Sequence, residues 1–156
     1  MPTDKIVVGL TGAFGSGCTT AARHLRDSRK FELLTLSDAL RKIWREKNKR
    51  KEAQRQDLQK LGDELRESRG AGILVDLALD DLDQKYKGRE EPTQIVVDGI
   101  RNLGEIQRLQ DLYGYRFTLI AVLATFDDRW DRIGSSAYVE HGLTRSDFIA
   151  DDQRDT

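Results

Sequence analysis

Residues 5–20, KIVVGLTGAFGSGCTT, decide the fold that this sequence predicts. An apolar run at residues 6–10 is typical of a fully buried parallel strand, and a glycine-rich turn separates it from a helical pattern that begins at Thr19. Glycines in such a turn let backbone N–H groups point inward, and the dipole of the following helix adds partial positive charge. The stretch therefore predicts a cradle for phosphate.

The glycine spacing fits the P-loop motif, G-x-x-x-x-G-K-[ST], at every defined position except the lysine. Cys18 stands at the lysine position, and Thr19 supplies the hydroxyl group. The alternative is a strand-to-helix turn with no ligand, but the filled hydroxyl position favours phosphate binding. The predicted nucleotide-binding residues are Gly12, Ala13, Phe14, Gly15, Ser16, Gly17, Cys18, Thr19 and Thr20.

Cys18 removes the point charge that a P-loop lysine places on the β- and γ-phosphates. A thiolate would repel phosphate, so we expect Cys18 to be neutral when a nucleotide is bound. Losing one charge-assisted hydrogen bond costs about 1.5–3 kcal/mol, which weakens binding without abolishing it. The hypothesis is that the backbone and Thr19 still hold a nucleotide, with slow or absent turnover unless an arginine reaches the same oxygens.

Composition predicts one domain of 156 residues with almost balanced charge, since 26 basic residues face 27 acidic ones. This balance creates no overall electrostatic field that would attract nucleic acid or a membrane surface. The single cysteine excludes an internal disulfide framework and fits a reducing compartment. With neither a leader pattern nor an apolar run long enough for a bilayer, we expect a cytoplasmic protein.

Strand patterns alternate with helical patterns along the chain, which predicts an α/β fold with a sandwiched parallel sheet. The apolar run FTLIAVLA at residues 117–124 is expected to be the most clearly buried strand, and residues 134–156 lack strong periodicity. Ligands of such a fold bind at the carboxyl ends of the strands. Strands are predicted at 6–10, 31–36, 94–98 and 117–124, and helices at 19–27, 37–44, 53–69, 73–82, 103–109 and 127–133.

Asp98 ends the predicted strand at residues 94–98. A carboxylate there could hold Mg²⁺ or its water beside Thr19, and this pairing with an upstream P-loop makes the pattern more specific. The alternative is a turn-forming Asp-Gly pair. Residues 41–55 are strongly basic, and a solvated corner between helices is favoured over a nucleic-acid patch because no aromatic platform accompanies the charge.

Several separated motifs together resemble the P-loop nucleoside and deoxynucleoside monophosphate kinases and their dephospho-CoA kinase-like relatives. The motifs are GLTGAFGSGCTT, LSDALRK, LQKLGDELR, VVDGIRNLGEIQRL and LIAVLATFDDRWDRI, and they span nearly the whole chain. The resemblance implies a three-layer P-loop NTPase fold with a parallel sheet, of the nucleotide monophosphate kinase type. Because those relatives continue into a fifth strand and a closing helix, it also implies that the last strand is lacking here.

The resemblance also implies roles for individual residues within a single domain over 1–156. A helical insert at about 38–85 would wall an acceptor pocket, and a lid-like region at about 127–150 would supply arginines to the transferring phosphoryl group. The implied acceptor-binding residues are Asp38, Arg41 and Arg101, the implied metal ligands Thr19 and Asp98, and the implied catalytic residues Asp98, Arg129 and Arg132, with Arg145 and Arg154 as further lid candidates.

Two functions follow from this resemblance. One is an enzyme that uses Mg²⁺ with ATP, or another nucleoside triphosphate, to phosphorylate a nucleoside monophosphate or similar small acceptor. The other is a catalytically impaired nucleotide-sensing domain of a larger protein, such as a fusion with a downstream cytidylate deaminase-like domain. A scaffold without a ligand is the third alternative. The expected partners are a nucleotide and a small phosphorylated acceptor, and the sequence is compatible with an oligomer. Neither a membrane nor nucleic acid is expected as a partner.

Overall fold

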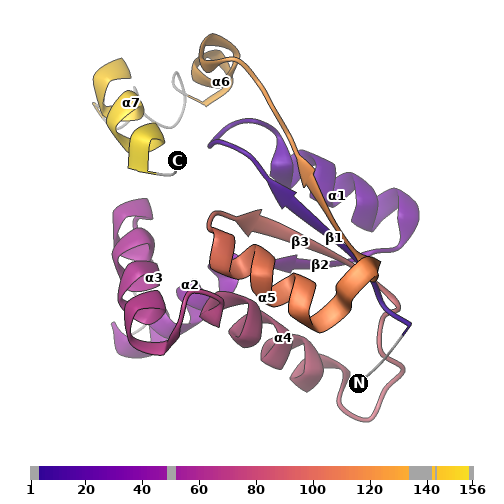
Figure 1. The fold of residues 1–156 in the computed structure, drawn as a ribbon. Coiled ribbons are helices and arrows are strands. Elements are labelled where there is room, and N and C mark those ends of the chain that lie inside the picture. The colour runs from indigo at the N-terminus through magenta and orange to yellow at the C-terminus, as the bar shows by residue number, and fades with distance from the viewer. Residues whose placement is uncertain (1–3, 49–51, 134–141, 143, 155–156) are drawn as a thin grey trace.

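The computed structural model describes residues 4–48, 52–133, 142 and 144–154 (Figure 1). Among these residues no helix combines the length and the apolar character that crossing a membrane requires. The elements in chain order are β1 (Ile6–Thr11), α1 (Cys18–Arg29), β2 (Glu32–Thr35), α2 (Leu36–Lys47), α3 (Arg55–Arg69), α4 (Ile73–Tyr86), β3 (Gln94–Ile100), α5 (Leu103–Tyr113), the 3-10 turn η1 (Gly114–Arg116), β4 (Phe117–Ala121), α6 (Phe126–Ile133) and α7 (Arg145–Arg154).

The strands form one parallel sheet in the order β2-β3-β1-β4, which confirms the predicted fold class. Helices connect the parallel strands, as the geometry of parallel pairing requires. Gly9 of β1 has no room for a larger residue, because a Cβ there would sit 2.6 Å from Ile100 Cδ1 of β3 and 2.7 Å from Phe117 Cε2 of β4. Because β1 and β3 pair in parallel, the sheet brings their carboxyl ends together.

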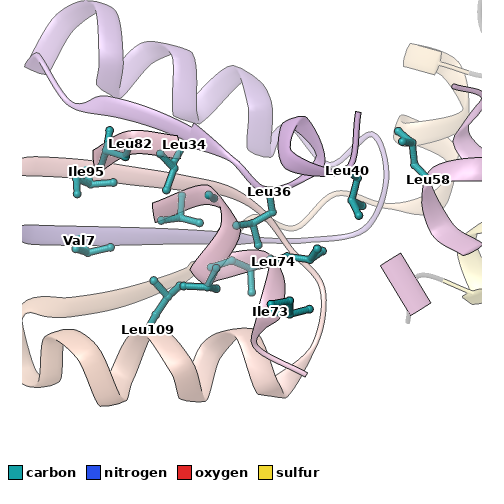
Figure 2. Packing of buried hydrophobic residues seen from close by; sticks show 14 of the residues in the cluster. Val7, Leu34, Leu36, Leu40, Leu58, Ile73, Leu74, Leu82, Ile95 and Leu109 are labelled. Atoms are coloured by element: carbon teal, nitrogen blue, oxygen red, sulfur yellow. The ribbon is translucent and has the colours of Figure 1, made fainter. Parts of the chain in front are cut away.

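Helices cover both faces of the sheet, with α1 on one side and α4 and α5 on the other (Figure 1). The alternation along β3 shows this directly, because Val96 packs into a small cluster under α1 while Ile95 and Val97 enter the larger cluster. Figure 2 shows how leucines of the surrounding helices fill the larger cluster. A strand buried on both faces explains the continuous apolar sequence of β3.

The prediction that residues 117–124 form the most buried strand is wrong. The strand β4 ends at Ala121 and pairs only with β1, at the edge of the sheet. Leu119 and Ile120, which point to opposite faces, remain 38% and 44% exposed. An apolar run reports a preference for burial but does not reveal whether a further strand lies beside it.

The helix α7 was not predicted, because residues 134–156 lack periodicity. Its start is nevertheless marked in the sequence by Thr144 and Asp147, which have the spacing of a capping box. The Asp147 carboxylate accepts from the Thr144 backbone N–H and, at 2.7 Å, from its hydroxyl. These hydrogen bonds hold the pKa of Asp147 below its ordinary value. The cap fixes the helix that carries Phe148 and Asp152 toward the rest of the protein.

Candidate functional site

The turn between β1 and α1 has the shape that its glycines allow. Gly17 has a φ of 109° and caps α1, a left-handed conformation that residues with a Cβ rarely adopt. A Cβ on Gly12 would overlap the carbonyl oxygen of Val122 and the hydroxyl of Ser16. The Ser16 N–H donates to the Ala13 carbonyl over 3.0 Å, which closes the turn. The motif glycines are therefore required by the local backbone and packing.

A cavity of about 930 Å³ opens beside this turn. All nine predicted nucleotide-binding residues line it, so the P-loop sequence and this cavity coincide. The cavity also lies at the carboxyl ends of β1 and β3, as expected for this class of sheet. The other lining residues are Leu10, Ala21, His24, Thr35, Ser37, Asp98, Gly99, Ile100, Arg101, Val122, Arg132 and Ile133.

Thr19 and Asp98, the predicted metal pair, meet in the wall of the cavity. The Thr19 hydroxyl donates to Asp98 Oδ2 over 2.8 Å although the residues lie on α1 and β3. Asp98 is only 4% exposed and lies inside β3, not in a turn after it. One hydroxyl and one carboxylate suit Mg²⁺, which usually takes a few protein oxygens plus phosphate and water. No larger metal-binding cluster of His, Cys, Asp or Glu occurs in the described part of the chain.

Cys18 occupies the first position of α1, where the motif has its lysine. Its side chain is half-buried and its sulfur lies 3.4 Å from the Ser16 hydroxyl. Cys18 lines the cavity and also packs against the small buried cluster under α1, and its thiol provides no positive charge. Any cation that meets a bound phosphate must come from another element.

Arg132, on α6, is the arginine nearest to that role. It lines the cavity, and its Nη1 lies 3.4 Å from the carbonyl oxygens of both Gly15 and Ser16. The residue is exposed, so its side chain has room to move toward a phosphate. Arg101, which follows β3, also lines the cavity.

Arg129 is placed differently from Arg132, although both were predicted as catalytic residues of the lid. It is 6% exposed and does not line the cavity. Its guanidinium forms a two-point ion pair with Asp152 of α7, over 2.5 and 2.9 Å, and Nη1 also donates to the Phe14 carbonyl over 3.2 Å. The hydrogen bonds to Asp152 raise the pKa of Arg129 further above its ordinary value.

The predicted acceptor residues are only partly brought together. Arg101 lines the cavity, but Asp38 and Arg41 do not. The Asp38 side chain is 72% exposed and forms a weak 3.9 Å pair with Arg41, and it borders a smaller hollow of about 170 Å³ beside β2. Ser37, one position earlier, lines the main cavity instead.

Two of the motifs that carried the family resemblance meet at Glu105. This fully buried carboxylate accepts from Arg66 Nη2 over 3.0 Å and from the Arg101 backbone N–H over 2.8 Å. Asn102 completes the arrangement as the N-cap of α5. The helical insert thus braces the turn that carries Arg101.

The remaining lid arginines contribute less to the cavity. Arg145 pairs with Asp127 on the surface and lies 5.0 Å from the Phe126 ring. The side chain of Arg154 and residues 134–141 and 143 of the lid-like region lie outside the described residues. The basic stretch at 41–55 is partly neutralised by pairs of Lys42 with Asp81 and Arg45 with Glu52, which supports the solvated corner.

Sequence reasoning missed His24, Thr35 and Ser37 as cavity residues. His24 lies one turn after Thr20 on α1, so helical spacing from the P-loop could have found it. Thr35 is paired with Asp98 across β2 and β3, and this register is set by tertiary structure. Val122 and Ile133 add apolar walls that no motif marked.

A family model described as an AAA domain matches residues 8–151. A UPF0200 protein of the archaeon Saccharolobus islandicus is 29% identical over 131 residues, which are 84% of this chain and 64% of that relative. The chain therefore spans less than two thirds of the length of this curated relative.

Solved structures give the same fold at lower identity. The protein TT1252 from Thermus thermophilus is 23% identical, with a TM-score of 0.58 over 96% of this chain and 79% of that one. A protein from Chloroflexus aurantiacus, provisionally described as a kinase, is 16% identical with a TM-score of 0.58, over 94% of this chain and 74% of that one. The predicted likeness to P-loop kinases is confirmed at the level of the fold.

Proposed function

We propose, from the premise that this chain belongs to the AAA-domain family, that it binds ATP with Mg²⁺ and transfers a phosphoryl group to a small phosphorylated acceptor. The observation that carries the proposal is the 2.8 Å contact between Thr19 and Asp98 in the wall of a cavity that all nine loop residues line. Backbone amides and a helix N-terminus favour the polyphosphate there, and the hydroxyl and carboxylate would hold the metal ion.

Positioning and charge stabilisation would carry the chemistry. The bond between the γ-phosphorus and the β–γ bridging oxygen breaks, a bond forms from that phosphorus to an acceptor phosphate oxygen, and ADP leaves. Arg132 is the proposed stabiliser of the transferring group, because its guanidinium already lies at the Gly15 and Ser16 carbonyls. It would supply from α6 the charge that Cys18 does not.

The proposed acceptor is a nucleoside monophosphate, with its phosphate on Arg101. The bracing of that turn by Glu105 supports this role, since the Arg101 backbone is fixed by a 2.8 Å hydrogen bond. Asp38 and Arg41 stay proposed acceptor contacts, although they lie outside the cavity and Ser37 lies in its wall. The lid role of residues 127–150, the insert role of 38–85 and a cytoplasmic location are likewise proposals.

Cys18 favours a second candidate, a domain that senses a nucleotide without turning it over. Such a role needs only different affinities for two conformations. A larger protein with a deaminase-like partner domain stays a prediction from the family resemblance.

An assay of ADP release with a panel of nucleoside monophosphates tests the proposal. Turnover that one monophosphate stimulates, and that Asp98→Asn abolishes, would support the kinase. Binding of ATP without stimulated turnover would support the sensor. If neither ATP binding nor turnover is detected at millimolar nucleotide, both candidates fail.

A further inference from the structure

Arg129 is the most deeply buried arginine that the described residues hold, and the proposed chemistry does not use it. Its charge is compensated by Asp152, whose two carboxylate oxygens meet its two terminal nitrogens. A planar two-point pair of this kind fixes orientation as well as charge. The guanidinium is therefore held in one place by α7.

The same guanidinium holds one peptide unit of the P-loop. Nη1 of Arg129 donates to the Phe14 carbonyl over 3.2 Å. In a trans peptide the carbonyl and the next N–H point in opposite directions. The hydrogen bond consequently fixes the Gly15 N–H on the side away from Arg129, and Gly15 itself has a φ of 82°, where the backbone has other conformations within reach.

Aromatic packing also joins the P-loop to α7. Phe148 of α7 is fully buried, and its ring centroid lies 6.2 Å from that of Phe14, 5.3 Å from that of Phe126 and 5.6 Å from that of Trp130. Phe14 also contacts Arg55 of α3, whose guanidinium carbon lies 3.8 Å from the ring centroid. The tip of the P-loop is thus held between α7 and α3.

We propose that Asp152 is a positioning residue for nucleotide binding: by clamping Arg129 against the Phe14 carbonyl, it holds the P-loop with the Gly15 N–H turned toward the phosphates. This inference rests on the proposed function, because it concerns the same loop. It assigns Arg129 to the support of the loop, whereas Arg132 contacts the cavity. Preorganisation of this kind matters more in a loop that lacks its lysine, since the backbone donors then carry most of the phosphate binding.

The test compares Asp152→Asn with Asp27→Asn in titrations with ATP and Mg²⁺. Asp27 pairs with Arg26 at the far end of α1, so its variant makes the same charge change away from the loop. We expect Asp152→Asn to weaken ATP binding about 10-fold, as for one lost charge-assisted hydrogen bond, and Asp27→Asn to bind as the wild type does. Asp152→Glu should recover most of the affinity. Equal affinity of Asp152→Asn and wild type, or equal losses in both Asn variants, would overturn the proposal.

A second readout separates positioning from general stability. Trp130 lies against Phe148, and Trp44→Phe leaves it as the single tryptophan of the chain. Nucleotide should change Trp130 emission in this background, and Asp152→Asn should reduce that change; an undiminished response would contradict the clamp. If Asp152→Asn loses its helical circular dichroism, Arg129→Lys replaces it, because lysine keeps the charge beside Asp152 but cannot form the two-point pair that fixes the orientation of the guanidinium. Unweakened binding by that variant would equally overturn the clamp.

Failure of the proposed function would give a different set of results from failure of the clamp. Wild-type protein would then give no heat with ATP, whereas Trp130 emission would still differ between Asp152→Asn and wild type if the clamp holds α7. Identical emission in the two proteins would contradict the clamp independently of any nucleotide.

Discussion

Replacing Cys18 with lysine should restore the charge that this P-loop lacks. The position lies at the N-terminus of α1 and lines a cavity of about 930 Å³, into which a longer side chain can extend. One charge-assisted hydrogen bond to phosphate contributes about 1.5–3 kcal/mol, which corresponds to a roughly 10- to 150-fold gain in affinity. Because Cys18 is only half-buried, we expect a value near the lower end of this range.

Titration calorimetry with ATP and Mg²⁺ measures the gain, and Cys18→Met is the matched control. Methionine adds length without charge, so it shows what the larger side chain does alone. Tighter binding by Cys18→Lys than by Cys18→Met, together with faster ADP release, would mean that Thr19, Asp98 and Arg132 already form a competent site. A gain in affinity without turnover would favour the sensor. If the lysine variant binds ATP no better than the methionine variant, the assignment of this loop to phosphate is refuted.

The remaining predictions concern stability. Gly9→Ala should lower the free energy of unfolding by about 1–3 kcal/mol in urea denaturation, because its Cβ would meet Ile100 and Phe117. Phe148→Ala should cost about 3–5 kcal/mol or release α7, visible as a lower thermal midpoint, whereas Phe148→Leu should cost less. The lowered pKa of Asp147 means that its capping contribution is complete above the ordinary value of 3.8 and is lost as pH falls through the folded-state value. When the pH is lowered, the helical circular dichroism of the wild type should therefore fall in a step that Asp147→Asn does not show.

The glycine-rich turn and the proximity of Thr19 to Asp98 could be predicted from sequence because their geometry is local or is imposed by strand direction. The spacing from Gly12 to Thr19 fixes the turn, and parallel strands must bring the end of β3 to the same edge as the end of β1. Thr19 and Asp98 are separated by 79 positions, yet their 2.8 Å contact follows from these two constraints.

Contacts that depend on helix orientation could not be predicted. The helix α2 begins at Leu36, one residue before the predicted start at residue 37, and successive side chains of a helix point about 100° apart. Ser37 consequently lines the cavity in place of Asp38. The pairing of Arg129 with Asp152 was equally hidden, because nothing in the sequence says how α7 returns to α6.

Calorimetric titration of the wild-type chain with ATP, with and without Mg²⁺, tests most directly whether backbone amides, Thr19 and Asp98 suffice to hold a polyphosphate without the lysine. We expect saturable heat that is larger or tighter with Mg²⁺, and a loss of the Mg²⁺ dependence in Asp98→Asn. The absence of heat at millimolar ATP, or binding that neither Mg²⁺ nor Asp98→Asn alters, would contradict the claim that these groups hold the polyphosphate.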